Sequence, residues 1–581
     1  MPIDRRAFLA YGSAACAALI SGAGLSGCGE NAESRHRYFR DGVASGDPTK
    51  ESVVLWTRYT ARDDDTASAV EVMYEIAQDA DFRHLVRKGS VQTDRSHDFT
   101  VHAEVGGLEA GKTYFYRFRV HESYSETGRT RTLPVKAETV KLAFFSCANY
   151  TNGYFNAYDY AARFDDLDAV IHLGDYIYEY GMVDADGKPA YATERAEAIG
   201  RVLPGDNDSE LLSLSDYRKR YALYRCDPML RTLHRLFPFI CIWDDHEIAD
   251  NAWTDGAENH SETAEGDYSK RKRNAMQAYF EWLPIRPVPR DGKATIYRAF
   301  EFGDLLSLHM LDTRHEGRSK QAGLSAEDLN DSEAFRKTLA SKQGKLMSDA
   351  QWNWLNDSLQ NAKSRWTVIA QQVIVEKLEL PVALAAILMQ LMDGDLSDDE
   401  KEALITEAEQ IANELASIKK KQVLHDPSLT EEEKARLQDT VPYNLDAWDG
   451  YPGERERLYA LLLGRKNCMI FSGDSHNAWC NLLHDDGGDR VAVEIGVPSV
   501  SSPGIESYLG LTDRARIDRM EQGVRMFNPE TVYDNLSDRG LVIAEFSQDR
   551  ADIHWIYVDS IDSDRYERLD ARCKTLAFAA S

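Results

Sequence analysis

The chain has 581 residues, of which 43% are hydrophobic, and a formal net charge of -28 at pH 7. This length allows a large catalytic core together with a smaller domain. So acidic a surface repels the phosphate backbone of nucleic acids, which argues against a general nucleic-acid-binding protein. A small anionic substrate stays compatible with this charge, because bound metal ions reverse the field inside a pocket.

The N-terminus has the pattern of an export signal. The pair Arg5-Arg6 precedes Ala7-Phe8-Leu9 and an apolar, Ala- and Gly-rich run that reaches Leu25. A charged region followed by an apolar one is typical of such signals. The Arg-Arg-x-Phe-Leu core resembles a twin-arginine signal, which exports folded and often metal-loaded proteins. One departure is Asp4, which stands where Ser or Thr is usual.

The signal is followed by Leu25-Ser26-Gly27-Cys28, which resembles a lipobox whose cysteine, Cys28, is lipidated and becomes the mature N-terminus. The alternative is an ordinary signal peptide cleaved nearby, with Cys28 incidental. No later segment has the roughly 18 continuous apolar residues of a membrane span. We therefore expect a periplasmic or cell-surface protein that touches a membrane only through this anchor, with residues 1–28 as the signal and 29–37 as a polar tether.

Residues 38–135 have the pattern of a small β domain. Val53–Arg58 is a strand candidate, Val70–Ile76 alternates apolar and polar residues, and Thr113–Val120 is aromatic and β-rich. Several short strands over about a hundred residues predict a sandwich. Lys112–Tyr116 looks like the fibronectin type III pattern.

From residue 136 onward, short apolar runs alternate with helical stretches, which is the pattern of an α/β core. The strand candidates are 141–146, 168–173, 237–243, 305–311, 366–370, 468–472, 491–497 and 541–546.

The segment 376–437 interrupts this pattern. Ser397–Glu400 is a capping box. Apolar residues then follow at the spacing of one helical face: Leu404, Ala408, Ile411, Leu415 and Ile418. We expect a helical insertion packed on a core formed by 136–375 and 438–581. A lid over the active site, or an apolar contact with a membrane or partner, remains as an alternative.

Chemically active residues directly follow four of the apolar runs. They are Cys147, then Asp175 and Tyr178, then Asp245 and His246, and finally Asp474 and His476. Loops beyond the carboxyl ends of strands form the ligand crevice of an α/β sheet. Each motif alone is weak, because an Asp after a strand is most often a cap or turn residue. Gly-Asp-x-x-Tyr, Asp-His-Glu and Gly-Asp-x-His in that order together predict one pocket.

The residue types favour a site for two metal ions. Asp175 is an anionic oxygen donor able to bridge two cations, which such sites hold about 3.5–4 Å apart around an in-line displacement. The Cys147 thiolate and the Tyr178 phenolate are electron-rich ligands suited to iron(III). Ligation also protects Cys147 from random disulfide formation in an oxidising compartment.

The remaining residues suit a second cation and proton transfer. Asp245 and Asp474 offer the hard oxygen ligands that calcium prefers. His246 and His476 are able either to ligate metal or to protonate a leaving alcohol near neutral pH.

At these residues the sequence resembles the PhoD-like alkaline phosphatase family of metallophosphoesterases. The matching segments are Gly42–Pro48 and Val54–Arg58 in the β domain, and Ser146-Cys147, Gly174–Glu179, Trp243–Glu247, Leu311–Arg314, Trp448–Pro452 and Ser472–Trp479 in the catalytic domain. The insertion shows the least resemblance. The resemblance implies an α/β (α+β) metallophosphoesterase sandwich core behind a fibronectin III-like β-sandwich domain. It also implies an Fe³⁺ ion with one or more Ca²⁺ ions, and hydrolysis of phosphomonoesters or phosphodiesters.

By position, the resemblance implies iron at Cys147, Asp175 and Tyr178, and calcium at Asp175, Asp245 and Asp474. It extends to purple acid phosphatases, whose middle motif reads Gly-Asn-His-Glu. Asp245 stands where that Asn would, and Asp474 where a His would. These oxygen ligands favour calcium over zinc at the second site, with other divalent metals left open.

The mechanism that we expect is attack at phosphorus, in line with the leaving group, by a metal-held hydroxide or another metal-held anionic oxygen. The metals and Arg314 spread the developing charge, and His246 protonates the leaving group. A structural ion pair between Arg314 and Asp312 is the alternative. Arg218 and Arg225 are further candidates for binding the substrate phosphate.

Three other functions remain open. One is a phospholipase-type phosphodiesterase, which the lipid anchor and the apolar insertion would suit. Another is a surface-anchored binding protein on a decayed hydrolase fold, which is disfavoured because all four loops keep usable ligands. A third is a metal-free aspartate-dependent phosphatase, which gives no role to Tyr178 or His476. We expect a monomer whose partner is a small phosphate ester.

Overall fold

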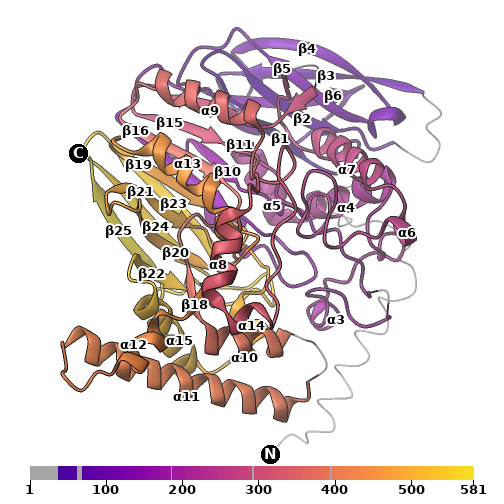
Figure 1. Ribbon diagram of the computed structural model, residues 1–581. Helices are drawn as coiled ribbons and strands as arrows, with labels where there is room; N and C mark the ends of the chain where they lie inside the picture. Colours follow the sequence, from indigo (N-terminus) through magenta and orange to yellow (C-terminus); the bar gives the residue numbers. More distant parts are fainter. Residues whose placement is uncertain (1–36, 62–67, 185, 291–292, 393–395) are drawn as a thin grey trace, which may run out of the picture.

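The computed structural model describes residues 37–61, 68–184, 186–290, 293–392 and 396–581 (Figure 1). The predicted export signal, the lipobox at Cys28 and all but the last residue of the tether lie outside the described residues.

Two mixed β-sheets form the catalytic core. The first has nine strands in the order β25 (Lys574–Ala579), β24 (Arg550–Tyr557), β23 (Gly540–Ser547), β9 (Thr139–Phe145), β10 (Ala169–His172), β11 (Pro238–Cys241), β1 (Val43–Gly46), β2 (Val53–Arg58) and β5 (Thr100–Val105). The second has seven in the order β14 (Arg298–Phe302), β15 (Leu306–Met310), β16 (Trp366–Gln371), β19 (Cys468–Ser472), β21 (Arg490–Gly496), β20 (Ala478–His484) and β22 (Thr531–Asn535). Phe144 and Phe471 stack between the sheets with ring centroids 3.8 Å apart, so the two sheets share one hydrophobic core.

Each sheet contains four neighbouring parallel strands. They are β9, β10, β11 and β1 in the first sheet, and β15, β16, β19 and β21 in the second. Every residue of β10, β11 and β19 is buried, as expected for parallel strands covered on both faces. The predicted strand candidates of the core are therefore confirmed, and their carboxyl ends carry the candidate residues.

The N-terminal β-sandwich is confirmed, but one of its layers belongs to the catalytic sheet. A five-stranded sheet is formed by β4 (Leu85–Asp94), β3 (Ala69–Ala77), β6 (Thr113–Val120), β7 (Ser123–Tyr124) and β8 (Gly128–Arg131). It packs on β1, β2 and β5 through a separate hydrophobic cluster that includes Leu55 and Tyr116. Because β1 also pairs in parallel with β11, the sandwich and the catalytic core share one continuous sheet.

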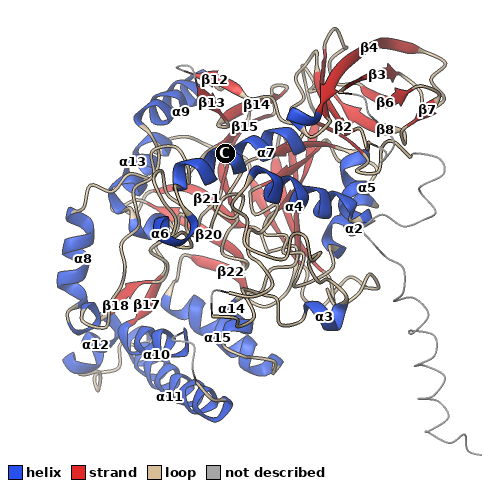
Figure 2. Cartoon of the chain, turned by 90° about the vertical axis from the view of Figure 1, so that its right-hand side faces the viewer, coloured by secondary structure: helices blue, strands red, loops and turns tan. Residues whose placement is uncertain are grey.

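Helices surround the two sheets (Figure 2). Their bounds are α2 (Asn156–Ala162), α3 (Ala196–Ile199), α4 (Leu214–Cys226), α5 (Pro228–Leu236), α6 (Glu262–Glu265), α7 (Tyr268–Trp282), α8 (Ser332–Ser341), α9 (Asp349–Asn361), α10 (Val382–Met392), α11 (Asp398–Val423), α12 (Glu431–Gln438), α13 (Pro452–Leu462), α14 (Ile505–Tyr508) and α15 (Arg514–Phe527). Two short ladders complete the structure: β12 (Val288–Arg290) with β13 (Lys293–Thr295), and β17 (Glu379–Pro381) with β18 (Thr440–Pro442).

The insertion consists of α10, α11 and α12. Its two ends meet in the β17–β18 ladder, where Glu379 pairs with Pro442. The predicted capping box of Ser397 and Glu400 begins α11, which packs against α15. Both views place these helices together at one end of the molecule (Figures 1 and 2).

Cys147, Cys241, Cys468, Cys480 and Cys573 are free cysteines. Among the described residues, no helix combines the length and the apolar character that crossing a membrane requires.

Candidate metal centre

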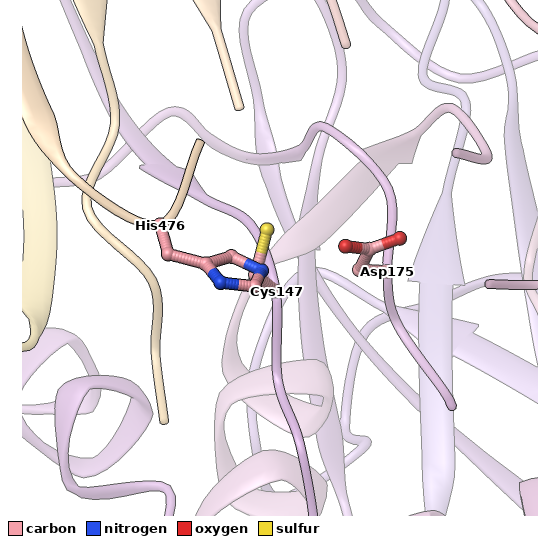
Figure 3. A group of neighbouring side chains, drawn as sticks. All are labelled: Cys147, Asp175 and His476. Carbon is pink, nitrogen blue, oxygen red and sulfur yellow. The ribbon is translucent and has the colours of Figure 1, made fainter. Parts of the chain in front are cut away.

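The loops after four strands bring the predicted metal ligands together. Cys147 follows β9, Asp175 follows β10, Asp245 and His246 follow β11, and Asp474 and His476 follow β19. Their ligand atoms form three groups, each with all atoms within 4.8 Å of one another: Cys147, Asp175 and His476; Asp175, Asp245 and His246; and Asp244, Asp245 and Asp474. Figure 3 shows the first group. Because Asp175 and Asp245 each belong to two groups, the three form one continuous cluster.

Four of these ligands have a left-handed backbone. The φ angles of Cys147, Asp175, Asp474 and His476 are 59°, 55°, 58° and 59°. This conformation costs a non-glycine residue about 1–3 kcal/mol and persists only where the surrounding structure enforces it. Beside Asp175, Gly174 has φ 109°, and a Cβ on it would lie 2.4 Å from the backbone nitrogen of Asp244. The chain therefore turns sharply at the strand ends to direct these side chains into one pocket.

Tyr178 lies beside the sulfur-containing group. Its phenol oxygen is 3.1 Å from Asp175 Oδ2 and 3.2 Å from His476 Nε2. Ser502 Oγ lies 2.6 Å from the same phenol oxygen and 3.0 Å from the carbonyl oxygen of Cys147. Ser502, which the sequence analysis did not identify, thus joins two predicted iron ligands.

Several carboxylate oxygens in this cluster have no hydrogen-bond donor. Within the described residues, Asp175 Oδ1, Asp244 Oδ2 and Asp245 Oδ1 are buried and make no hydrogen bond. A buried charged group without a partner is costly, and a metal ion is one of the partners that proteins use to compensate it. The donor set of one thiol, one phenol, two imidazoles and several carboxylates fits such ions.

Deprotonation of the acidic groups in the cluster requires additional positive charge. Burial, reinforced by neighbouring acidic groups, raises the pKa of Cys147, Asp175 and Tyr178 well above their usual values. Burial raises the pKa of Asp474 to about 7. These groups ligate metals in their deprotonated forms, so bound cations are what would allow them to ionise together.

The two histidines differ in charge and orientation. Nδ1 of His246 is 2.8 Å from Glu179 Oε2. Burial opposes the charge of His246, but the carboxylates of Glu179 and Asp245 outweigh it and raise the pKa of the imidazole. His476 instead donates from Nδ1 to the carbonyl oxygen of Pro503 at 2.7 Å, and burial lowers its pKa to about 3. A neutral imidazole with Nε2 left as an acceptor is the form that binds metal.

Arg314 lies among the acidic ligands and is fully buried. Its guanidinium group donates to Asp244, Asp446 and Asp474 and lies 3.5 Å from Asp245 Oδ1. The alternative pair with Asp312 involves only the backbone N–H of Arg314, at 3.0 Å. Arg314 therefore offsets part of the negative charge of these carboxylates.

Glu247 connects two of the ligand loops. Its carboxylate accepts hydrogen bonds from the backbone N–H groups of Asp175 at 3.1 Å, Tyr176 at 2.6 Å and Asp244 at 2.7 Å. The third residue of the Asp-His-Glu motif thus positions the loops after β10 and β11.

Comparison with known proteins identifies the family of this site. The model of the PhoD-like phosphatases matches residues 142–555, and that of the N-terminal domain of PhoD-like phosphatases matches residues 24–134. The chain belongs to the PhoD-like phosphatase family. It is 32% identical over 461 residues to alkaline phosphatase D of Bacillus subtilis (strain 168), a match that covers 77% of this chain and 66% of that protein, slightly less than two thirds of its length. A solved structure of PhoD superposes with a TM-score of 0.68 at 28% identity, covering 92% of this chain and 89% of that one. The predicted family and fold class are confirmed.

Two residues predicted to bind phosphate make their contacts elsewhere in this family member. Arg218 donates to Glu281 at 2.6 and 2.7 Å and to the carbonyl oxygen of Ser96. Arg225 donates to the carbonyl oxygen of Asp41 at 3.2 Å and lies 4.5 Å from the centre of the Trp56 ring. The contacts of both guanidinium groups hold α4 against the β domain, and we assign phosphate binding to neither.

Proposed function

We propose that the chain is a metal-dependent phosphoesterase that hydrolyses phosphomonoesters, phosphodiesters or both. The observation that supports this most directly is the set of buried carboxylate oxygens without a hydrogen-bond donor beside a thiol and a phenol. The family membership and the similarity to alkaline phosphatase D agree with the proposal. Hydrolysis adds water across the P–O bond and releases an alcohol and a phosphate.

The donor types favour two different ions. Iron(III) suits Cys147, Asp175, Tyr178 and His476, because thiolate and phenolate are strong electron donors. Calcium suits the oxygen-only group of Asp244, Asp245 and Asp474, with Asp175 between the two. When bound, the ions would supply the positive charge that polarises the phosphoryl group.

The protein residues then have distinct roles in the reaction. His246, held by Glu179 in its charged form, would protonate the leaving alcohol, a role that its raised pKa supports. Arg314 keeps the carboxylates of Asp244 and Asp474 in place. Each of its three nitrogens donates to a carboxylate, which favours a positioning role for Arg314; the contact with phosphate stays a prediction.

The metal assignment is tested by removing single ligands. Cys147→Ser and Tyr178→Phe should each lose iron, its visible absorption and the hydrolysis of p-nitrophenyl phosphate. Cys468→Ser is the matched control, because Cys468 is a free, buried cysteine on β19 that belongs to none of the ligand groups. Unchanged colour and iron content in the two ligand variants would contradict the assignment, whereas loss of iron in the control would show a general effect of cysteine replacement.

We further propose that the protein is exported by the twin-arginine route and anchored by a lipid at Cys28, as a monomer that acts on a small phosphate ester. The supporting features are Arg5-Arg6, the apolar run and the lipobox-like segment. Replacement of Cys28 by Ala should abolish incorporation of labelled palmitate and release the protein from membranes. Retention of the label would contradict the anchor.

A further inference from the structure

An apolar cavity of about 440 Å³ lies between the insertion and α15. Its walls come from α10 with Leu384, Ile387 and Leu388, from α11, and from α15 with Met520 and Phe527. It is much larger than the apolar cavity of about 150 Å³ that holds a benzene molecule, and it falls within the range of about 300–1,000 Å³ of small-molecule sites.

Small residues on two facing helices keep this space open. Ala408, Ala412 and Ala416 of α11 line the cavity at intervals of four residues, which places them on one face of the helix. On α15 the lining includes Gly523, where an added Cβ would meet no atom within 4 Å. Longer side chains at these positions would fill the space.

The charged residues of the lining are already paired. Arg516 binds Glu402 and Glu409, and Arg519 also binds Glu409. The fourth charged lining residue, Glu379, pairs with Arg336. No charged residue of the lining therefore needs a ligand for its partner, and the chemistry of the cavity matches an uncharged hydrocarbon.

One segment joins the cavity to the metal centre. Ser502 touches Tyr178 and Pro503 holds His476, and the next residues along the chain include Ile505 of α14, which lines the cavity. On the other side, the lining residue Trp479 donates from its indole to Ser475 Oγ at 3.0 Å, within the loop that carries Asp474. The cavity lining is thus linked to the ligand loops through Ser502, Pro503 and Trp479.

We propose that this cavity binds the alkyl chain of an amphiphilic phosphoester whose phosphate group lies at the metal centre. The proposal rests on the proposed phosphoesterase function and specifies its substrate class as lipid-like esters. The cations would bind the phosphate group. The hydrocarbon chain would move from water into the apolar cavity that α10, α11 and α15 line. The insertion then acts as the element that binds the alkyl chain of the substrate.

The test is the dependence of turnover on chain length. The metal-loaded protein is assayed with a series of n-alkyl phosphates of increasing length, each below its critical micelle concentration, with p-nitrophenyl phosphate as the chain-free reference. Full burial of each added methylene group would raise kcat/KM by up to about fourfold until the cavity is filled. Gly523→Phe should flatten this rise and leave the turnover of p-nitrophenyl phosphate unchanged.

Gly523→Ala is the matched control, because it removes the same glycine from the helix and adds only one methyl group to the cavity. It should keep the chain-length dependence. Ala412→Phe fills the cavity from α11 and provides a second test if Gly523→Phe does not fold. A flat series in the unaltered protein, or an undiminished rise in a folded cavity-filling variant, would overturn the proposal. If a protein segment occupies the cavity instead of an alkyl chain, kcat/KM will not depend on the length of the alkyl chain.

A direct binding measurement separates this proposal from the phosphoesterase function. A fluorescent long-chain fatty acid, which contains no phosphorus, should bind the unaltered protein and Gly523→Ala, and bind Gly523→Phe at least tenfold more weakly. If the protein binds this probe but hydrolyses no phosphoester, the proposed function fails while the alkyl-chain site stands. If the probe does not bind, the site itself is refuted.

Discussion

The hydrogen bonds of Glu247 give the sharpest test of how the metal centre is built. In Glu247→Gln the side chain keeps its shape but has only one acceptor oxygen. The two carboxylate oxygens of the native residue accept from three backbone N–H groups, those of Asp175, Tyr176 and Asp244. Whichever way the new amide is turned, at least one of these N–H groups faces an NH₂ group and loses its acceptor.

The size of the effect follows from two terms of similar magnitude. A hydrogen bond to a charged group contributes about 1.5–3 kcal/mol. The left-handed conformation of Asp175, with φ 55°, costs about 1–3 kcal/mol. Loss of one bond is therefore enough to let the loop relax away from its strained conformation. We expect the affinity for metal to fall about ten- to hundredfold, as is usual when a group that orients a ligand is removed.

The assay is metal titration of the stripped protein together with hydrolysis of p-nitrophenyl phosphate, at a pH well above 7. Burial raises the pKa of Glu247 to about 7, so its carboxylate is ionised under these conditions. Glu454→Gln is the matched control. Glu454 is also a buried glutamate, and its Oε2 alone accepts from the backbone N–H groups of Leu346 and Met347 and from the indole of Trp352; it belongs to no ligand group, so its replacement controls for loss of a buried carboxylate.

Glu247→Gln should unfold at lower temperature and bind metal more weakly than the unaltered protein. Glu454→Gln should keep its three hydrogen bonds through its one amide oxygen and bind metal as the unaltered protein does. Metal affinity and stoichiometry in Glu247→Gln equal to those of Glu454→Gln would refute the reasoning. That result would mean that the ligand loops keep their geometry without the carboxylate.

Three further predictions concern charged groups. Arg314→Leu removes the guanidinium group that pairs with the buried carboxylates and should cost about 3–5 kcal/mol of stability. Added calcium should restore part of this stability. Equal losses with and without calcium would argue against a calcium site at these carboxylates. Burial and the charge of Glu494 raise the pKa of Glu376 to about 8, so between pH 4.5 and 8 the native state holds a proton that the unfolded state releases. Glu376→Gln should therefore stabilise the protein increasingly as pH rises from 4.5 to 8. A difference in melting temperature between this variant and the unaltered protein that does not change with pH would contradict this. Arg218→Ala should leave kcat/KM for p-nitrophenyl phosphate unchanged, because its guanidinium group is paired with Glu281; a large fall in kcat/KM would restore it as a phosphate ligand.

The strand ends allowed much of the site to be predicted from the sequence. Cys147, Asp175, Asp245 and Asp474 each follow a short apolar run, and parallel strands place such residues at one edge of a sheet. The same rule applied to the strand at 491–497 points to the segment that contains Ser502, since β21 is also parallel to its neighbour β19. This residue was missed because a serine is a weaker chemical signal than a thiol or a carboxylate.

Other contacts of the candidate site leave no pattern in the local sequence. Asp446 binds Arg314 and Arg318 from the loop after the insertion, and it follows no core strand. The orientation of Arg314 toward Asp244 also depends on how the two sheets are stacked, which periodicity does not reveal. The cavity under the insertion likewise leaves no pattern in the local sequence. The helical pattern of the insertion predicts helices, but it does not predict the distance between them or the size of the space they enclose.

The shared sheet also determines how the molecule can be divided. The N-terminal strand β1 occupies the edge of β11, with Ser45 opposite Pro238. A fragment that begins at residue 136 would leave the N–H and C=O groups of that edge exposed, and such an edge is a template for pairing with other molecules. The catalytic region alone would therefore carry an edge that favours aggregation, and fragments for expression should keep both parts together.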